Sequence, residues 1–304
     1  MALRLGRREF GEHEPVIMAV VDLDPGPEAD GAKAAALDRV GRAVADGAAA
    51  VEVCLPWEEP GDRAGDGPGE GPVAVPEEEV RRTAAFVAEV RRRHPDVVIA
   101  VRTWRHEVAE AVCAAGADLL DDPRGGADPE LAGVAARHRA GLVCTYTGRS
   151  VPDAVPDAVP DASAAGAEGT AADVLRVTAG LAERAVALGV PPESVLVSPG
   201  TDLSGDGPEA LEAARHLGGL VVGGRPVLVS LSTGPSGSGA PGGSPGTGPE
   251  GRRMLAALAT AAVAAWQGAR VYRVHAVAET RQVLDMVASV AGHRPPAVAR
   301  RGLG

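Results

Sequence analysis

Residues 100–126 read AVRTWRHEVAEAVCAAGADLLDDPRGG, and this stretch predicts the fold of the chain. An apolar run ends in Arg102, and the alanine-rich helical segment that follows it ends at Gly116. A second short strand, ADLL, then ends in the paired carboxylates Asp121 and Asp122. Two strands joined by a helix pair in parallel, and parallel α/β enzymes carry their functional groups just past the ends of their strands. The polar ends of these two strands are therefore candidate site residues.

The same alternation of apolar runs and helical patterns recurs along the chain. Strands are expected at 15–21, 49–54, 97–101, 118–120, 141–145, 194–197, 226–231 and 270–274. Helices are expected at 32–46, 77–94, 105–115, 129–139, 171–188, 208–216, 251–266 and 277–290. Eight such units are the number at which a parallel sheet closes, so we predict a single (β/α)8 TIM barrel of the α/β class. A doubly wound open sheet is the alternative, but no G-x-G-x-x-G motif follows the first strand.

Composition limits the partners and the compartment. The formal net charge of −11 argues against binding to nucleic acid. No apolar run is long enough to cross a membrane, and the first residues, MALRLGRREFGEHEP, do not resemble a signal peptide. Three cysteines without C-x-x-C spacing predict neither a disulfide framework nor a cysteine-rich zinc site. We therefore expect a cytoplasmic protein with reduced thiols.

The domain organisation follows from the same patterns. We expect an N-terminal extension at 1–14, one barrel over 15–292 and a C-terminal tail at 293–304. Three loops, at 58–75, 150–169 and 233–250, follow predicted strands and therefore lie on the face that carries the site. The second contains VPDA three times, and 14 of the 18 residues of the third are Gly, Ser or Pro, so we expect these loops to be flexible.

Several stretches resemble the dihydropteroate synthases, a family of pterin-binding TIM barrels. They are IMAVV near the start, residues 100–126, GLVCTYTG, RVYRVHAV and ETRQVLDMVASVAGHRPP, and the similarity covers about Pro15 to Arg294. The chain is most similar to a divergent second paralogue found in actinobacteria. The family joins a hydroxymethyl-dihydropterin diphosphate to p-aminobenzoate and releases pyrophosphate. The resemblance implies a substrate pocket at the strand ends, with Mg²⁺ and cations that stabilise the departing diphosphate.

The pterin pocket that the resemblance implies is altered at four positions. Arg102 stands where the family has an Asp that accepts hydrogen bonds from the pterin, and Asp121 replaces an Asn. Ser198 replaces a second pterin-binding Asp, and Gly234 replaces the lysine that contacts both substrates. Each lost partner of a buried polar group costs about 1–3 kcal/mol, so we expect weak pterin binding.

The diphosphate site gains acidic groups but keeps two basic ones. Glu58 and Glu59 stand where the family grips phosphate, and two carboxylates would repel it. Asp22 replaces an Asn that ligates Mg²⁺, and its carboxylate oxygen could still bind that ion. Arg273 and His275 match the family's anion-binding pair, and their spacing of two places both on one side of a strand.

Simpler interpretations of these residues remain open. Arg273 and His275 would also suit an ion pair with Glu52 or Asp22. Arg102 and Asp121 end adjacent strands, where a structural salt bridge would fill the pocket. The pair 121–122 could bind a metal ion, but the sequence offers no third ligand. The histidines on helices, among them residue 106, are expected to be solvated surface groups.

Three functions are compatible with the sequence. We expect a dihydropteroate-synthase-like pseudoenzyme of the folate pathway family, catalytically inactive and kept for binding a pterin or phosphate-bearing small molecule or an active paralogue. The first alternative is a functional dihydropteroate synthase, which is a transferase. The second is another pterin- or folate-binding barrel. The resemblance also implies a homodimer formed through the last helices, and no cofactor other than Mg²⁺.

Overall fold

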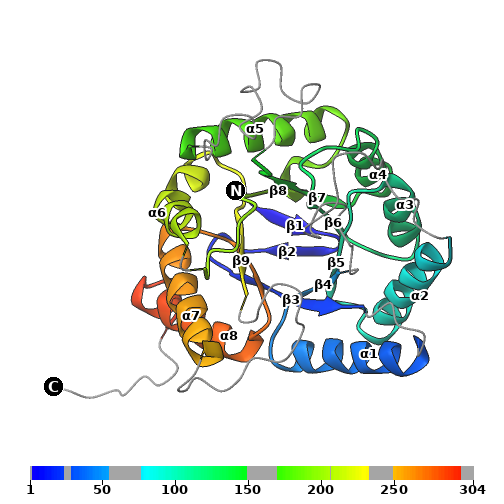
Figure 1. Ribbon diagram of the computed structural model, residues 1–304, viewed down its shortest axis with the longest axis horizontal. Helices are drawn as coiled ribbons and strands as arrows, with labels where there is room; N and C mark the ends of the chain where they lie inside the picture. The colour runs from blue at the N-terminus through cyan, green and yellow to red at the C-terminus, as the bar shows by residue number, and fades with distance from the viewer. Residues whose placement is uncertain are drawn as a thin grey trace, which may run out of the picture.

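The described part of the chain folds as a closed barrel of eight parallel strands surrounded by eight helices (Figure 1). The computed structural model describes residues 2–23, 29–54, 77–148, 170–205, 207–232 and 249–295. The predicted (β/α)8 TIM barrel is thus confirmed.

The barrel strands are β3 (Val16–Asp22), β4 (Ala50–Cys54), β5 (Val98–Arg102), β6 (Leu119–Asp122), β7 (Gly141–Thr145), β8 (Val195–Ser198), β9 (Leu228–Leu231) and β10 (Val271–Val274). The helices are α1 (Ala29–Ala45), α2 (Glu77–Arg93), α3 (His106–Ala114), α4 (Leu131–His138), α5 (Ala171–Ala187), α6 (Pro208–Val222), α7 (Pro249–Gln267) and α8 (Val277–Val290). A short 3-10 helix, η2 (Pro192–Ser194), precedes β8.

Hydrogen bonding closes the sheet. Its order is β8-β7-β6-β5-β4-β3-β10-β9, with every neighbouring pair parallel. The two end strands meet where Val197 N–H donates to the carbonyl of Pro226 at 3.0 Å, beside a bridge from Val197 to Val227. The barrel of described strands is thus nearly closed, with only this short pairing between β8 and β9, and exposes far less edge backbone than an open sheet would.

Several details differ from the sequence prediction. α6 continues past the expected end at residue 216 to Val222, through the glycines at 218 and 219. α7 begins at Pro249, two residues inside the loop predicted for 233–250. The remainder of that loop, and the loops predicted at 58–75 and 150–169, lie outside the described residues. The expected N-terminal extension contains a hairpin, β1 (Leu3–Leu5) paired with β2 (Arg8–Phe10).

Alternate side chains of the strands build two separate cores. Outward-facing residues such as Val51, Leu120 and Tyr272 pack against the helices in one large cluster. Inward-facing residues such as Ala50, Leu119 and Val271 form a second cluster inside the barrel. Because the strand period is two, each strand contributes to both cores.

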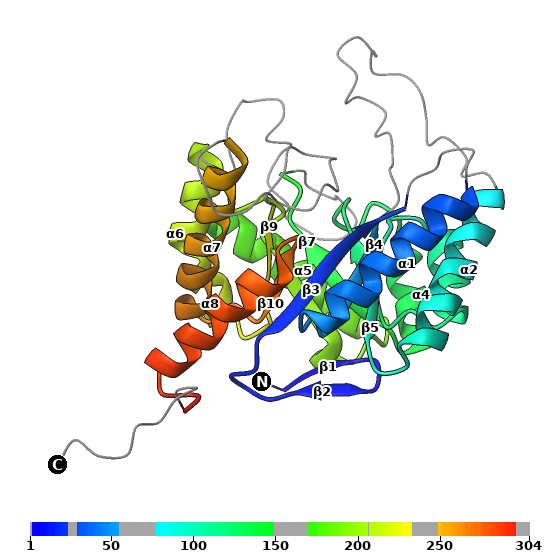
Figure 2. The ribbon, with the colours of Figure 1, turned by 90° about the horizontal axis from the view of Figure 1, so that it is seen from below.

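The N-terminal hairpin closes the barrel at the end where the strands begin. Figure 2 shows β1 and β2 lying across that end. Leu3, Leu5 and Phe10 are buried in the inner cluster, together with side chains from all eight barrel strands. Arg4 also lies 3.2 Å from Glu193 of η2. The hairpin therefore acts as an apolar plug, and the opposite end of the barrel is the mouth.

Removing apolar volume from the plug should destabilise the whole barrel. Leu5 is fully buried, so Leu5→Ala is expected to lower the free energy of unfolding by about 3 kcal/mol, as for other core leucines. The matched control is Leu211→Ala on α6, where the side chain is 45% exposed and the cost should stay under about 1 kcal/mol. Urea unfolding of both variants measures the difference, and equal costs would contradict the plug.

Candidate functional site

The mouth of the barrel gathers the predicted site residues. Asp22, Arg102 and Ser198 are the last residues of β3, β5 and β8. Asp121 lies in β6, Arg273 in β10 and His275 directly after β10. All are therefore at the carboxyl ends of their strands, as the sequence predicted. Gly234 lies outside the described residues, as do Glu58 and Glu59.

A buried ion-pair network occupies the centre of the mouth. Nη1 of Arg273 donates to Oδ2 of Asp121 at 2.7 Å and lies 3.4 Å from Oε2 of Glu52. The side chain of Glu52 is fully buried and that of Asp121 is 4% exposed. The ion pair of Arg273 with Glu52 that the sequence left open is thus present, and a second carboxylate shares it.

Neighbouring strands extend this network. Nη1 of Arg102 lies 3.8 Å from Oδ2 of Asp121, which is the salt bridge considered from the sequence. Thr145 donates its hydroxyl to Oδ1 of Asp121 at 3.4 Å, and Cys54 donates its thiol to Oε2 of Glu52 at 3.3 Å. The strand register places these groups side by side, because residue 102 pairs with residues 54 and 121.

Burial and the neighbouring arginines give the two carboxylates different pKa values. Burial raises the pKa of Glu52 to about 7, against the attraction of Arg273 and with added repulsion from Asp121. Burial also acts to raise the pKa of Asp121, but the guanidinium groups of Arg273 and Arg102 outweigh it and hold that pKa below its usual value. At neutral pH the mouth therefore contains an ionised Asp121 and a Glu52 close to its titration midpoint.

The two basic groups predicted to bind an anion differ in what they can offer. Burial opposes the charge of Arg273, but Glu52 and Asp121 outweigh it and raise its pKa, so its charge is already compensated. Burial lowers the pKa of His275, which favours the neutral imidazole. Anion binding by Arg273 and His275 therefore remains a prediction. In the structure, Arg273 is paired with Glu52 and Asp121.

A second polar cluster joins the segments that follow β8 and β9 at the mouth. Asp202 accepts hydrogen bonds from the N–H of Ser204 at 2.9 Å and from the N–H of Ser232 at 3.2 Å. The hydroxyl of Ser204 donates to the carbonyl of Ser232 at 2.7 Å. Sequence reasoning missed this role of Asp202, although an Asp two residues before a Ser is a turn signal.

The turn after β8 depends on its glycine. Gly200 has φ +77°, and a Cβ there would lie 1.6 Å from the carbonyl oxygen of Tyr146. The buried hydroxyl of Ser198 accepts the N–H of Gly200 at 3.3 Å. Ser198 thus stabilises the turn at the position where the resemblance implies a pterin-binding carboxylate.

Asp122 does not extend the mouth toward a metal site. It faces the helices, and its carboxylate accepts the N–H groups of Arg124 and Gly126 in the turn after β6. Burial raises its pKa to about 6 against these two hydrogen bonds. No group of three metal-capable side chains in the part of the chain that the structure describes includes residue 121 or 122.

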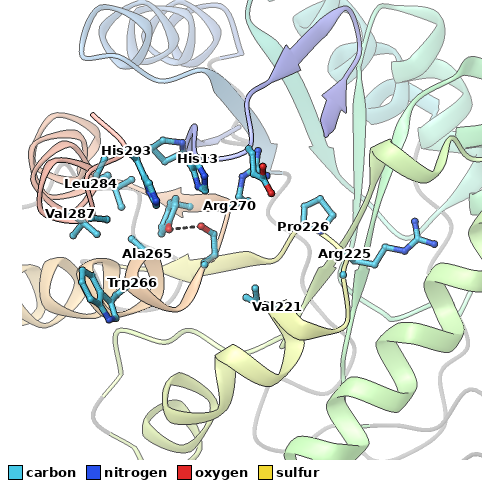
Figure 3. Close-up of a pocket in the computed structure, with 18 residues that line it drawn as sticks. His13, Val221, Arg225, Pro226, Ala265, Trp266, Arg270, Leu284, Val287 and His293 are labelled. Atoms are coloured by element: carbon cyan, nitrogen blue, oxygen red, sulfur yellow. Dashed lines mark hydrogen bonds between the residues drawn. The ribbon is translucent and has the colours of Figure 1, made fainter. Parts of the chain in front are cut away.

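A separate cleft of about 450 Å³ lies toward the plugged end, between α7, α8 and the segment after β2 (Figure 3). Apolar side chains of Trp266, Leu284 and Val287 line it, together with His13 and His293, whose rings stack at 3.7 Å. This cleft contains none of the residues of the mouth, so the two regions are distinct.

The titration of Glu52 predicts how stability changes with pH. A carboxyl group whose folded pKa exceeds the unfolded value of 4.5 favours folding most below pH 4.5, and this contribution is lost as the pH rises through about 7. Glu52→Gln removes that loss. Between pH 5 and pH 8 the variant should therefore gain about 2–3 kcal/mol of stability relative to the wild type.

Urea unfolding at a series of pH values checks this expectation. Glu183→Gln, at an exposed position on α5, is the control and should follow the wild type at every pH. A Glu52→Gln variant with an unchanged pH profile would show that Glu52 is ionised throughout.

Known proteins resemble this chain over nearly its whole length. The family described as pterin binding enzyme matches residues 25–275. The chain is 43% identical over 302 residues to "Inactive dihydropteroate synthase 2" of Mycobacterium tuberculosis (strain ATCC 25618 / H37Rv), covering 98% of this chain and 89% of the relative. The protein of the same name from Mycobacterium leprae (strain TN) is 41% identical over 300 residues, covering 97% of each chain.

Solved structures give the same result. Mycobacterium tuberculosis Rv1207 superimposes with a TM-score of 0.70 at 36% identity, covering 96% of this chain and 99% of the other. Dihydropteroate synthase from Thermus thermophilus in complex with 4-aminobenzoate superimposes with a TM-score of 0.70 at 27% identity, covering 95% and 100%. The chain therefore belongs to the pterin binding enzyme family, as a dihydropteroate-synthase-like member.

Proposed function

We propose that this chain is a catalytically silent dihydropteroate-synthase-like barrel whose substrate pocket is closed by its own ion pairs. One observation carries the proposal: Arg273 bonds to Asp121 at 2.7 Å and lies 3.4 Å from Glu52 in the centre of the mouth. The names of the two mycobacterial relatives, which call those proteins inactive, support it.

The network competes with a pterin for the same groups. A pterin edge needs free acceptors, but Asp121 already accepts hydrogen bonds from Arg273 and Thr145 and faces Arg102. Breaking such a buried pair without replacing both partners costs about 3–5 kcal/mol. A bound pterin would have to offset this cost. It would also find fewer hydrogen-bond acceptors, because Arg102 and Ser198 stand where the family resemblance implies two carboxylates. Weak pterin binding follows.

The diphosphate would also find less positive charge than the chemistry requires. Stabilising the charge that develops on a leaving group is commonly the largest catalytic contribution. The guanidinium of Arg273 is shared by two carboxylates, and burial favours a neutral His275. The side chain of Arg102 is 34% exposed to water and faces Asp121. We therefore favour the silent barrel over the functional synthase.

Purified protein should form no dihydropteroate from the usual two substrates above a no-enzyme control. An active dihydropteroate synthase assayed in parallel establishes the detection limit, and product is measured by chromatography. The chain should also fail to restore growth in a strain without its own synthase. Turnover by the unmodified chain would refute the proposal and establish the functional synthase.

Restoring the pocket should recover binding before catalysis. Arg102→Asp, Ser198→Asp and Gly234→Lys together return the groups that hold a pterin, and calorimetry with a pterin diphosphate should then show saturable binding. Glu183→Gln, at its exposed position on α5, is the control and should bind no better than the wild type. Equal pterin affinity in the wild type and the triple variant would contradict a closed pocket.

Magnesium binding at Asp22 remains a prediction. Mg²⁺ is commonly held by one or two carboxylates together with the phosphates of a substrate. Among the described residues, no group of three metal-capable side chains includes Asp22. The site would therefore depend on a bound diphosphate, so we assign Mg²⁺ no role in the free protein.

We also propose that two copies of the chain associate through α7 and α8. Large apolar side chains are exposed on these two adjacent helices: Leu255 (54%), Val263 (50%) and Trp266 (67%) on α7, and Met286 (64%) and Val290 (68%) on α8. Residues 255, 263 and 266 share one face of α7, and residues 286 and 290 share one face of α8. Exposed apolar side chains on two adjacent helices are costly in water, and a second copy would cover them.

A charge placed in this surface should prevent association. Val263→Asp with Met286→Asp is expected to convert a dimer into a monomer, measured by size-exclusion chromatography with light scattering. Leu188→Asp, 46% exposed at the end of α5, is the matched control and should leave the dimer intact. Figure 1 places α5 away from α7 and α8. A monomeric wild-type chain, or a dimer in both variants, would exclude this interface.

None of the described helices meets the length and hydropathy needed to cross a bilayer.

A further inference from the structure

His106, the first residue of α3, lies among three carboxylates on the rim of the mouth. Its Nδ1 is 2.8 Å from Oδ2 of Asp128 and 3.6 Å from Oε2 of Glu107. Its Nε2 is 3.6 Å from Oε2 of Glu130. The residues come from two elements, the start of α3 and the segment between β6 and α4. The histidine is 35% exposed, as expected for a surface group, but it also has carboxylate partners that the sequence did not indicate.

The carboxylate nearest to the imidazole is held in a fixed orientation. Asp128 is only 13% exposed, and its Oδ2 accepts the backbone N–H of His106 at 3.0 Å. Its Oδ1 accepts the backbone N–H of Glu130 at 2.9 Å. Hydrogen bonds of this kind fix the direction of a ligand's lone pairs, as outer-shell partners do in metal sites.

The carboxylates around His106 favour a positive charge at this point. The hydrogen bond with Asp128 raises the pKa of His106, against the opposing effect of burial and with support from Glu107 and Glu130. One atom each from His106, Glu107 and Asp128 lies within 4.8 Å of the others. Three ligand atoms about 2 Å from a common metal ion lie roughly 3–4 Å apart, so small side-chain movements would complete the set.

We propose that His106, Glu107 and Asp128 form a binding site for a divalent transition-metal ion such as Zn²⁺, bound through Nδ1 of the imidazole. One imidazole with two carboxylates suits Zn²⁺ and its first-row neighbours, whereas Mg²⁺ and Ca²⁺ prefer oxygen ligands alone. The site is outside the ion-pair network of the mouth, so it does not depend on the proposed loss of catalysis.

Position also suggests what such an ion would do. It would join the start of α3 to the segment before α4, two regions that follow β5 and β6 at the mouth. Because binding would replace a proton on His106, Zn²⁺ affinity should rise with pH.

The chain contains a matched control for the experiment. His138 on α4 pairs with Glu110 at 2.6 Å, but the same carboxylate also binds Arg137. One carboxylate shared with a guanidinium is a poor metal site, so His138→Ala tests the loss of an imidazole without the loss of the proposed ligand set.

The full chain, freed of metal by a chelator, is titrated with Zn²⁺ by calorimetry, alone and with excess Mg²⁺. We expect one saturable Zn²⁺ per chain that Mg²⁺ does not displace. His106→Ala should weaken this binding at least about tenfold, and His138→Ala should not. Since His106→Ala also breaks an ion pair, Asp128→Asn and Glu107→Gln are titrated too, with circular dichroism confirming that each is folded. Co²⁺ should give a visible ligand-field band that is lost with His106→Ala.

Two outcomes would overturn the site. One is a wild-type chain without saturable Zn²⁺ binding. The other is equal Zn²⁺ affinity in the wild type, His106→Ala and Glu107→Gln, which would place any bound ion elsewhere in the chain.

Discussion

When eight parallel strands close into a barrel, every second side chain of each strand points into the barrel interior. Water can reach this interior only from its two ends. That space must be filled, because an empty interior would lose both apolar burial and van der Waals contacts. At the end where the strands begin, apolar side chains fill it and the β1–β2 hairpin plugs it. At the mouth, the inward positions carry charges instead, and these must be paired or neutralised where they are buried.

The mouth meets much of this requirement with its own side chains, and leaves Oε1 of Glu52 and Nδ1 of His275 buried without a hydrogen-bond partner among the described residues. Arg273 satisfies two carboxylates at once, and burial shifts the titration of Glu52 toward neutral pH. A binding pocket keeps some polar groups unsatisfied until its ligand arrives, whereas here Asp121 and Arg273 already have partners within the chain. Arg102 adds a second guanidinium beside the carboxylate of Asp121. The same charged side chains of the mouth can thus either pair with one another or bind a ligand.

Much of this could be predicted from the sequence. Alternation of apolar runs and helical patterns predicted the barrel, and the polar residues at the strand ends predicted the mouth, including contact between Arg102 and Asp121. Predictions from local sequence signals were wrong where tertiary contacts outweigh those signals. The glycines at 218 and 219 suggested the end of a helix, but α6 packs against α5 and α7 and continues. The alternating apolar residues of β1 and β2 were too few to be distinguished from an extension.

The side-chain partners of the site were harder to predict. Asp202 lies near Ser232, and His106 lies near Asp128, only because separate loops meet at the mouth. Such pairs are far apart in sequence, so neither periodicity nor spacing indicates them. The protonation of Glu52 has the same origin, since its pKa reflects burial and two guanidinium groups from other strands.

The plug also imposes an order on folding. Leu3, Leu5 and Phe10 are synthesised before every barrel strand, yet their partners extend as far as Val271 on β10. The hairpin cannot reach its final environment until the last strand has emerged and the barrel has closed. Contacts of such long sequence separation form slowly. While the barrel strands are being made, three large apolar side chains therefore stay without their native cover, and the nascent chain must be protected from association at this hairpin.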